Sequence, residues 1–198
     1  MRKAPDYAAA MQPTDRLTGS LVRLGMVRNA DIDRLVDLAD DTRAARLGDS
    51  GPAFPWSEAN QREWWTSRVT DDDVRVFAIR LLDDASTLLG TITLSSIDAS
   101  NRVAQLGMSL PDPGHWGHGY GTDAVRLLLA FAFDDMNLHR VEMGVFAFNT
   151  RAIACYEGVG FVHEGTHREY LQRDGQRHDM YLYGILCLLY TSDAADEL

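Results

Sequence analysis

Three glycines at alternating positions form the segment of this sequence that is best suited to chemistry. Gly117, Gly119 and Gly121 lie within residues 116–124, between a predicted strand and a strongly apolar predicted helix. Glycine permits backbone torsions that other residues avoid, and it lets a ligand approach the main chain closely. A helix that begins here adds unpaired N–H groups and the positive end of its dipole. The segment therefore predicts a binding site for a phosphate or pyrophosphate group.

The spacing of these glycines distinguishes the site from two common phosphate-binding motifs. Dinucleotide-binding folds use G-x-G-x-x-G after the first strand of a parallel unit, whereas this chain has G-x-G-x-G after four antiparallel-looking strands. A nucleotide P-loop places Lys and then Ser or Thr after its glycines, and no lysine follows them here. A flexible loop without a ligand is the remaining alternative, and the long helix that starts at the glycines argues against it.

The elements that must position this loop are predicted from hydrophobic spacing and turn residues. The expected order is one strand, two helices, three strands, a helix, a strand, a helix and two strands. The first four strands are expected to form an antiparallel meander, and segment 48–55 is expected to be a loop because it holds Gly and Pro residues. Strands are predicted at 21–24, 74–81, 88–97, 103–110, 140–148, from 161–165 onward and at 180–186, and helices at about 29–38, 58–68, 121–133 and 150–158.

A second motif follows the glycine loop. Segment 149–161 carries Asn, Ala, Tyr and Gly-Phe at a characteristic spacing, one helix and one strand after the glycines. With both motifs in order, residues 17–186 resemble the GCN5-related N-acetyltransferases (GNAT), particularly the branch of ribosomal-protein N-terminal and spermidine acetyltransferases. The resemblance implies an α/β (α+β) fold with a mixed, mostly antiparallel sheet that is splayed at the cofactor site and flanked by helices. One departure is Trp116, where the family often has Gln or Arg.

The resemblance implies acetyl-coenzyme A (acetyl-CoA) as the cosubstrate. Backbone amides of residues 117–122 would bind its pyrophosphate, and the strand edge at residues 108–110 would pair with the peptide-like pantetheine arm. Asn149 would contact the arm from the other side, and it is also a candidate N-cap of the helix that follows. The full set of predicted cofactor-binding residues is Met108, Ser109, Leu110, Trp116, Gly117, His118, Gly119, Tyr120, Gly121, Thr122, Asn149 and Ala152.

Acetyl transfer to an amine needs a deprotonated amine, a hydrogen-bond donor for the carbonyl oxygen and an acid for the departing thiolate. The resemblance assigns the acid to Tyr156, for which a core tyrosine is the alternative, and the oxygen's donor to a backbone N–H within residues 108–110. Glu142 is the predicted general base because its strand borders the acceptor side in the family, and a structural carboxylate is the alternative. Further candidates for the base are Ser95, Ser96, Asp179 or a chain of water molecules.

Other reactive residue types have simpler interpretations. The histidine pairs at 115 with 118 and at 163 with 167 have no third ligand at metal-site spacing, so no metal site is predicted. Cys155 is expected to pack in the core. Three tryptophans are expected either to line the acceptor site, where aromatic rings can hold a cation, or to pack between the first two helices. These are Trp56, Trp64 and Trp65.

Composition narrows the class of protein. The 198 residues, 45% of them hydrophobic, predict one compact domain. The resemblance implies that this is an N-acetyltransferase domain at 17–186, after a flexible leader at 1–16 that does not read as a signal peptide. A formal charge of −10 argues against a nucleic-acid partner and mildly favours a cationic acceptor. The sequence lacks an apolar run long enough to cross a membrane and has only two cysteines, which favours a cytoplasmic setting. Residues 187–198 resemble a translated sequencing adapter and are expected to be a non-native tail.

The expected function is therefore transfer of an acetyl group from acetyl-CoA to a primary amine by direct attack in a ternary complex. The acceptor would be a protein N-terminus or a small amine such as a polyamine or aminoglycoside, and the protein a monomer or homodimer. A catalytically silent acyl-CoA-binding or sensor module is the alternative, and the presence of Tyr156 argues against it.

Overall fold

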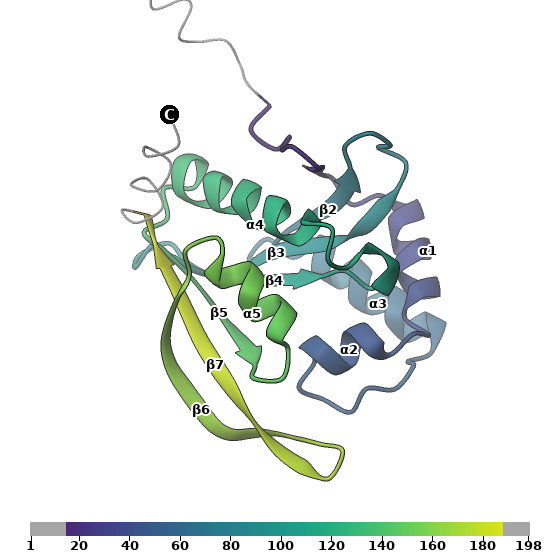
Figure 1. Ribbon diagram of the computed structural model, residues 1–198. Coiled ribbons are helices and arrows are strands. Elements are labelled where there is room, and N and C mark those ends of the chain that lie inside the picture. Colours follow the sequence, from purple (N-terminus) through teal and green to yellow (C-terminus); the bar gives the residue numbers. More distant parts are fainter. Residues whose placement is uncertain (1–14, 188–198) are drawn as a thin grey trace, which may run out of the picture.

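The computed structural model describes residues 15–187, which form a seven-stranded sheet with helices on both faces (Figure 1). The strands are β1 (Val22–Gly25), β2 (Arg75–Leu81), β3 (Leu88–Asp98), β4 (Val103–Ser109), β5 (Arg140–Phe146), β6 (Val162–Arg173) and β7 (Gln176–Leu186). Their order across the sheet is β1-β2-β3-β4-β5-β7-β6. Strands β1 to β4 form the predicted antiparallel meander, and the long β6–β7 hairpin joins the sheet through β7 and β5.

The sheet opens between β4 and β5. These two strands are parallel and pair only at Val103–Gln105 with Arg140–Glu142. Beyond that point β4 stays paired with β3 as far as Ser109, and β5 stays paired with β7 as far as Phe146. The facing edges of β4 and β5 therefore diverge, and their backbone groups there are available to a ligand. The predicted mixed, mostly antiparallel and splayed sheet is confirmed.

Two pairs of helices hold the sheet between them. Helices α4 (Tyr120–Ala130) and α5 (Thr150–Glu157) cover one face, where the largest group of buried apolar residues lies. Helices α1 (Asn29–Leu38) and α3 (Glu58–Val69) pack on the other face of β2 and β3. Trp65 of α3 lies in this second core, where it packs together with residues of α1. The second core consists of Ile32, Leu35, Trp65, Ala78 and Leu88.

Several elements differ from the sequence-based prediction. A short helix, α2 (Arg43–Gly48), precedes the predicted loop; it has no buried residue, so it lacks the apolar stripe by which helices are recognised. The end of α4 continues as a π-helical turn, Phe131–Asp135, and a 3₁₀ turn, Pro113–His115, precedes the glycine loop. Strands β6 and β7 are longer than predicted. Register shifts near His163 and His167 interrupt the alternating pattern of side chains, so the sequence does not reveal the full length of the hairpin.

The predicted leader and tail fall almost entirely outside the described residues. Only the last two residues of the leader, 15 and 16, and the first residue of the tail, Cys187, are described. Among the described helices, none combines the length and the apolar character needed to cross a membrane.

Candidate active site

The glycine loop has the backbone conformation for which glycine is suited. Gly117 and Gly119 have φ angles of 79° and 82°, in the left-handed region that side chains disfavour. Gly119 is the N-cap residue of α4, and its carbonyl accepts the Asp123 N–H at 3.0 Å. A Cβ atom on Gly117 would meet no atom within 4 Å. The main chain at Gly117 is therefore open to a ligand in front of the N-terminus of α4.

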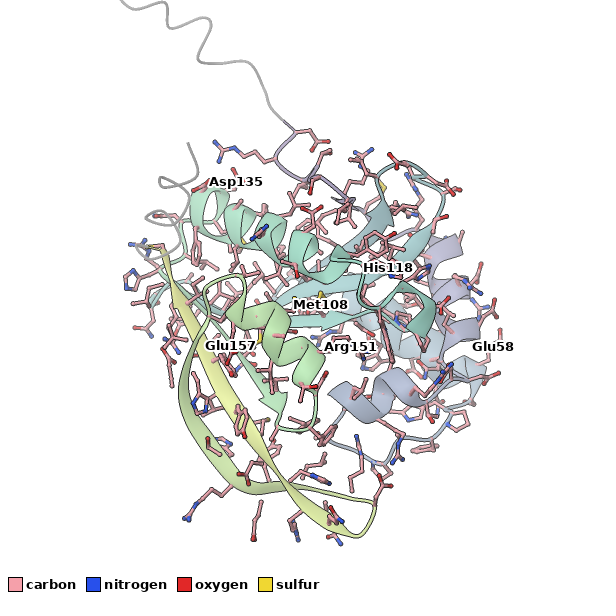
Figure 2. The ribbon with its side chains drawn as sticks, in the orientation of Figure 1. Glu58, Met108, His118, Asp135, Arg151 and Glu157 are labelled. Atoms are coloured by element: carbon pink, nitrogen blue, oxygen red, sulfur yellow. The ribbon has the colours of Figure 1, made fainter. Side chains whose placement is uncertain are left out.

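The loop packs directly on the end of β4. A Cβ atom on Gly121 would lie 3.1 Å from Met108 Cε, so only glycine allows this close approach without displacing the methionine. The indole Nε1 of Trp116 donates to the Leu110 carbonyl at 2.7 Å. Figure 2 shows Met108 near the start of α4 and His118 in the loop before it. The predicted loop and strand edge are thus brought together, although the Leu110 carbonyl already has a partner.

A guanidinium group lies over the ring of Trp116, the first residue of the glycine loop. The guanidinium carbon of Arg151, at the start of α5, is 3.7 Å from the centre of the Trp116 ring. A cation over an indole face is attracted by the ring's quadrupole. Trp116 therefore presents an apolar surface at the loop, and Arg151 supplies a guanidinium beside it.

An aspartate that the sequence analysis did not single out fixes the loop to β1. Asp123, in the first turn of α4, accepts the backbone N–H groups of Leu21 and Val22 at 2.8 and 2.9 Å. It also accepts the hydroxyl of Ser20 at 3.2 Å. An acidic residue in the first turn of a helix was the available signal, but its partners lie about a hundred residues away in the chain.

Helix α5 begins at the second motif. Asn149 is the N-cap residue: its side-chain oxygen accepts the Ala152 N–H at 3.3 Å, and its amide group donates to the Leu47 carbonyl of α2 at 3.2 Å. The predicted capping role is confirmed, and contact with a cofactor stays a prediction. Thr122 donates to Cys155 Sγ at 3.4 Å, which links the start of α4 to α5. Burial raises the pKa of the Cys155 thiol, as expected of a packing residue.

Tyr156 lies within the core on the α4–α5 face. It is 7% exposed, and its ring packs edge-on against Phe161 with the ring centres 5.8 Å apart. Burial raises the pKa of this phenol well above its usual value. The side chain is therefore neutral across the physiological range and able to donate a hydrogen bond.

Glu142 lies on the opposite face of the sheet from Tyr156. Its neighbours Val141 and Met143 are buried in the core beneath α4 and α5, and strand alternation turns Glu142 the other way. Its Oε2 accepts from Arg140 Nε at 3.1 Å, and Arg140 also forms a two-pronged ion pair with Glu164. The structure thus does not bring the predicted acid and base together on one face.

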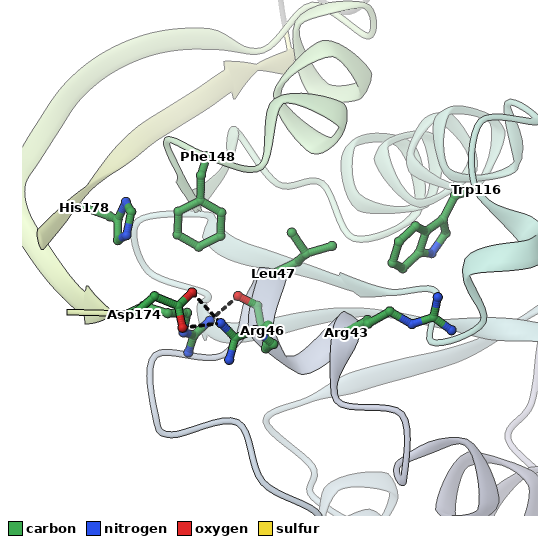
Figure 3. Close-up of a pocket in the computed structure, with 8 residues that line it drawn as sticks. Arg43, Arg46, Leu47, Trp116, Phe148, Asp174 and His178 are labelled. Carbon is green, nitrogen blue, oxygen red and sulfur yellow. Dashed lines mark hydrogen bonds and ion pairs between the residues drawn. The ribbon is translucent and has the colours of Figure 1, made fainter. Parts of the chain in front are cut away.

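A cavity of about 440 Å³ lies beside the open end of the splay. Its wall includes Phe148, which follows β5, and Trp116 of the glycine loop. Figure 3 shows these two rings on opposite sides of the cavity, with Leu47 between them and the Arg46–Asp174 ion pair along one edge. Trp56 and Trp64 are largely exposed and do not line it. The lining residues are Arg43, Arg46, Leu47, Trp116, Phe148, Arg173, Asp174 and His178.

The remaining candidates have local partners. Asp179 accepts the Glu169 N–H at 2.8 Å, and Ser96 sits in an irregular stretch of β3 with a φ of 50°. His118 stacks on Tyr120 with ring centres 5.5 Å apart, and His163 bonds to Thr166. Within residues 15–187, no group of three or more His, Cys, Asp or Glu side chains is arranged to hold a metal ion.

Comparison with known proteins agrees with this geometry. The family model described as an acetyltransferase (GNAT) domain matches residues 22–162. The uncharacterized N-acetyltransferase p20 of Bacillus licheniformis is 28% identical over 135 residues, which are 67% of this chain and 75% of that protein. The spermidine N(1)-acetyltransferase of Vibrio cholerae is 29% identical over 103 residues, 52% of this chain and 58% of that protein.

A solved structure has the same fold. The crystal structure of spermidine N-acetyltransferase from Vibrio cholerae, in complex with CoA and spermine, superposes with a TM-score of 0.76. The match covers 86% of this chain and 98% of that one at 23% identity. The chain therefore belongs to the GNAT family of acetyltransferases. Its enzyme class is that of the acetyl-CoA-dependent N-acetyltransferases.

Proposed function

We propose that this enzyme binds acetyl-CoA across the splay and transfers the acetyl group to a primary amine by direct attack in a ternary complex. The observation that carries the proposal is the divergence of β4 from β5 beside two left-handed glycines at the start of α4. Backbone amides of residues 117–122 would hold the pyrophosphate, where the helix dipole favours negative charge. The edge of β4 at Met108 and Ser109 would pair with the pantetheine arm.

The second side of the splay suits the same substrate. Asn149, the N-cap residue, and Ala152 lie at the start of α5. Arg151, over the Trp116 ring, adds a guanidinium that can pair with a phosphate oxygen. His118 and Tyr120, stacked in the loop, offer a flat surface beside the amides.

The reaction needs proton donors and acceptors in defined places. Tyr156 donates a hydrogen bond, and finally its proton, to the departing thiolate. A backbone N–H within residues 108–110 donates to the carbonyl oxygen as negative charge develops. Glu142 is the proposed base that accepts the proton from the attacking amine. Glu142 lies at the last β5 position that pairs with β4, on the face opposite Tyr156, so the proposed mechanism requires that the thioester be reached from both faces of the sheet.

The acceptor class follows from the family and its relatives: a primary amine, either on a protein N-terminus or on a small molecule such as a polyamine or aminoglycoside. Such substrates are consistent with an enzyme of the cytoplasm. The cavity beside the splay offers the acceptor an entry next to the glycine loop.

Two measurements test the proposal. Calorimetry with CoA and acetyl-CoA should show binding, and a thiol-reactive dye should report CoA release when a panel of primary amines is added. Binding without release with any amine would favour a catalytically silent acyl-CoA-binding module. Folded protein that gives no heat with either ligand would overturn both functions.

A further inference from the structure

Three of the eight residues that line the cavity beside the splay are arginines. Arg43, Arg46 and Arg173 contribute three guanidinium groups, whereas Asp174 is the sole carboxylate among the described lining residues. Both Oδ atoms of Asp174 accept from one nitrogen of Arg46, at 2.6 and 2.5 Å. Arg43 pairs with Asp41, which is not part of the lining. The charged side chains of the lining are therefore mostly positive.

Arg173 has an unusual set of partners for a buried cation. It is 9% exposed, and its guanidinium donates to the backbone carbonyls of Arg46, Asp49 and Gly51. Within residues 15–187 it forms no ion pair with a carboxylate. Burial raises the pKa of the nearby Asp49 carboxyl. The positive charge of Arg173 acts to lower the pKa values of the Asp49 and Asp174 carboxyls, but neither forms a direct ion pair with it. A buried charge without a direct counter-ion is costly, and a bound anionic group would offset that cost.

The rest of the lining suits an apolar body. The rings of Trp116 and Phe148 and the side chain of Leu47 form its uncharged part. A volume of about 440 Å³ is near the lower end of the range for small-molecule sites, roughly 300–1,000 Å³. The cavity therefore fits a molecule of amino-acid or dipeptide size better than a protein surface.

We propose that the acceptor carries a carboxylate together with its amine, as an α-amino acid with an apolar side chain does. The inference rests on the proposed acetyl transfer, because it assumes that the cavity holds the acceptor. A polyamine is disfavoured, since its ammonium groups would meet three guanidiniums without a free carboxylate. The acidic charge of the whole chain does not oppose this, because salt screens surface charges beyond about 8–10 Å whereas the lining acts at contact.

A matched set of amines tests the substrate class. Phenylalanine, its carboxamide and 2-phenylethylamine share one apolar body, and spermidine represents the polyamines. Rates of CoA release are corrected for the fraction of each amine that is unprotonated. The expected kcat/KM is roughly tenfold or more higher for phenylalanine than for the other three, the scale of a lost hydrogen bond to a charged group. Equal or faster release with the amide, phenylethylamine or spermidine would overturn the inference.

Two substitutions that break the same ion pair separate charge from structure. R46Q removes a cation and leaves Asp174 unpaired, so KM for phenylalanine should rise by about tenfold. D174N removes the carboxylate that pairs with Arg46, which frees the guanidinium. The KM for phenylalanine should therefore fall. A purely structural role of the pair would move both variants in the same direction. R62Q is the control, because Arg62 has the same 42% side-chain exposure as Arg46 and pairs with Asp33 and Glu58, none of which lines the cavity. It should leave KM unchanged.

The outcomes distinguish this inference from the proposed function. Acetyl-CoA binding with CoA release only for carboxylate-free amines overturns the carboxylate requirement and leaves acetyl transfer standing. Binding of acetyl-CoA without release for any amine, carboxylates included, also counts against the inference. Absence of acetyl-CoA binding overturns the proposed function itself.

Discussion

At the scale of single residues, the two proposed catalytic side chains differ in burial, in partners and in their face of the sheet. The spacing of a motif predicts Tyr156 as the acid, and its burial explains why a neutral phenol persists there. The position of its strand predicts Glu142 as the base, and the structure adds Arg140 as its partner. Both assignments stay predictions, and the sequence alone could not give the face of the sheet or the partners of either residue.

Replacement of Tyr156 by Phe should lower kcat by about 10²-fold or more, the scale of general acid catalysis, while the Kd for acetyl-CoA stays unchanged. Only the hydroxyl is removed, so core packing is kept. Stopped-flow or steady-state CoA release and calorimetry measure the two quantities. Tyr183→Phe is the control, because this buried tyrosine bonds to Glu157 at 2.7 Å and should affect stability rather than kcat. Full turnover by the Tyr156 variant would exclude the acid role.

Replacement of Glu142 by Gln tests the proposed base. If Glu142 is the base, the variant should have a kcat that is lower by about 10²–10⁴-fold. Higher pH should partly restore its activity, because more of the amine is then unprotonated. The matched control is Glu164→Gln, because Glu164 is the other carboxylate paired with Arg140. If both variants lose activity equally, the loss reflects the Arg140 cluster and not base catalysis.

At the scale of elements, prediction succeeded where local pattern and tertiary role agree. Helix α4 is apolar on most sides and begins at glycines, so its residues identify it without knowledge of its neighbours. Helix α2 buries no residue; the contacts that hold it come from Asn149, Arg173 and Asp174, all more than a hundred residues away. Such a helix is specified by tertiary contacts, and single-sequence reasoning does not see them.

Gly119 tests the role of the loop as an element. Alanine there would adopt a left-handed conformation that costs about 1–2 kcal/mol, and its Cβ would lie 3.2 Å from Leu21 Cδ1. Gly119→Ala should therefore shift the loop and weaken acetyl-CoA binding by roughly tenfold, as measured by calorimetry. Gly175, in the β6–β7 turn, has a similar φ of 74° and open space around it. Gly175→Ala therefore introduces a similar backbone strain outside the glycine loop and serves as the control. Equal acetyl-CoA affinity of the two variants would contradict the proposed loop role.

At the scale of the whole molecule, the cavity is assembled from segments that are distant in the chain. Its walls come from α2, the glycine loop, Phe148 shortly after β5, and the tip of the β6–β7 hairpin. Two motifs mark the glycine loop and the start of α5 in the sequence, and the structure brings these two segments together. The sequence did not predict the cavity, because Phe148 and the arginines carry no local pattern and meet only through the fold.

Two buried tyrosines predict the response of the whole fold to alkali. Burial and the bond to Glu157 raise the pKa of Tyr183 to about 12, and burial raises that of Tyr156 as well. Unfolded tyrosines ionise near pH 10, so the unfolded chain loses these protons first. Their stabilising contribution is therefore complete below about pH 10 and is lost as the pH rises toward about 12.

Urea unfolding at about pH 8 and about pH 11 measures this loss as a lower midpoint at the higher pH. Tyr183→Phe should show a smaller drop than the unaltered chain, because it removes one of the two groups. An identical drop in both proteins would mean that Tyr183 does not contribute.

The guanidinium of Arg173 fastens the end of α2 to the tip of the β6–β7 hairpin, and the Arg46–Asp174 pair makes a second link between the same two elements. A motion that widens the cavity must therefore move α2 and the hairpin tip together, or break both the Arg173 hydrogen bonds and the Arg46–Asp174 ion pair. Departure of the acetylated product and movement of the hairpin tip would then share a single relaxation rate.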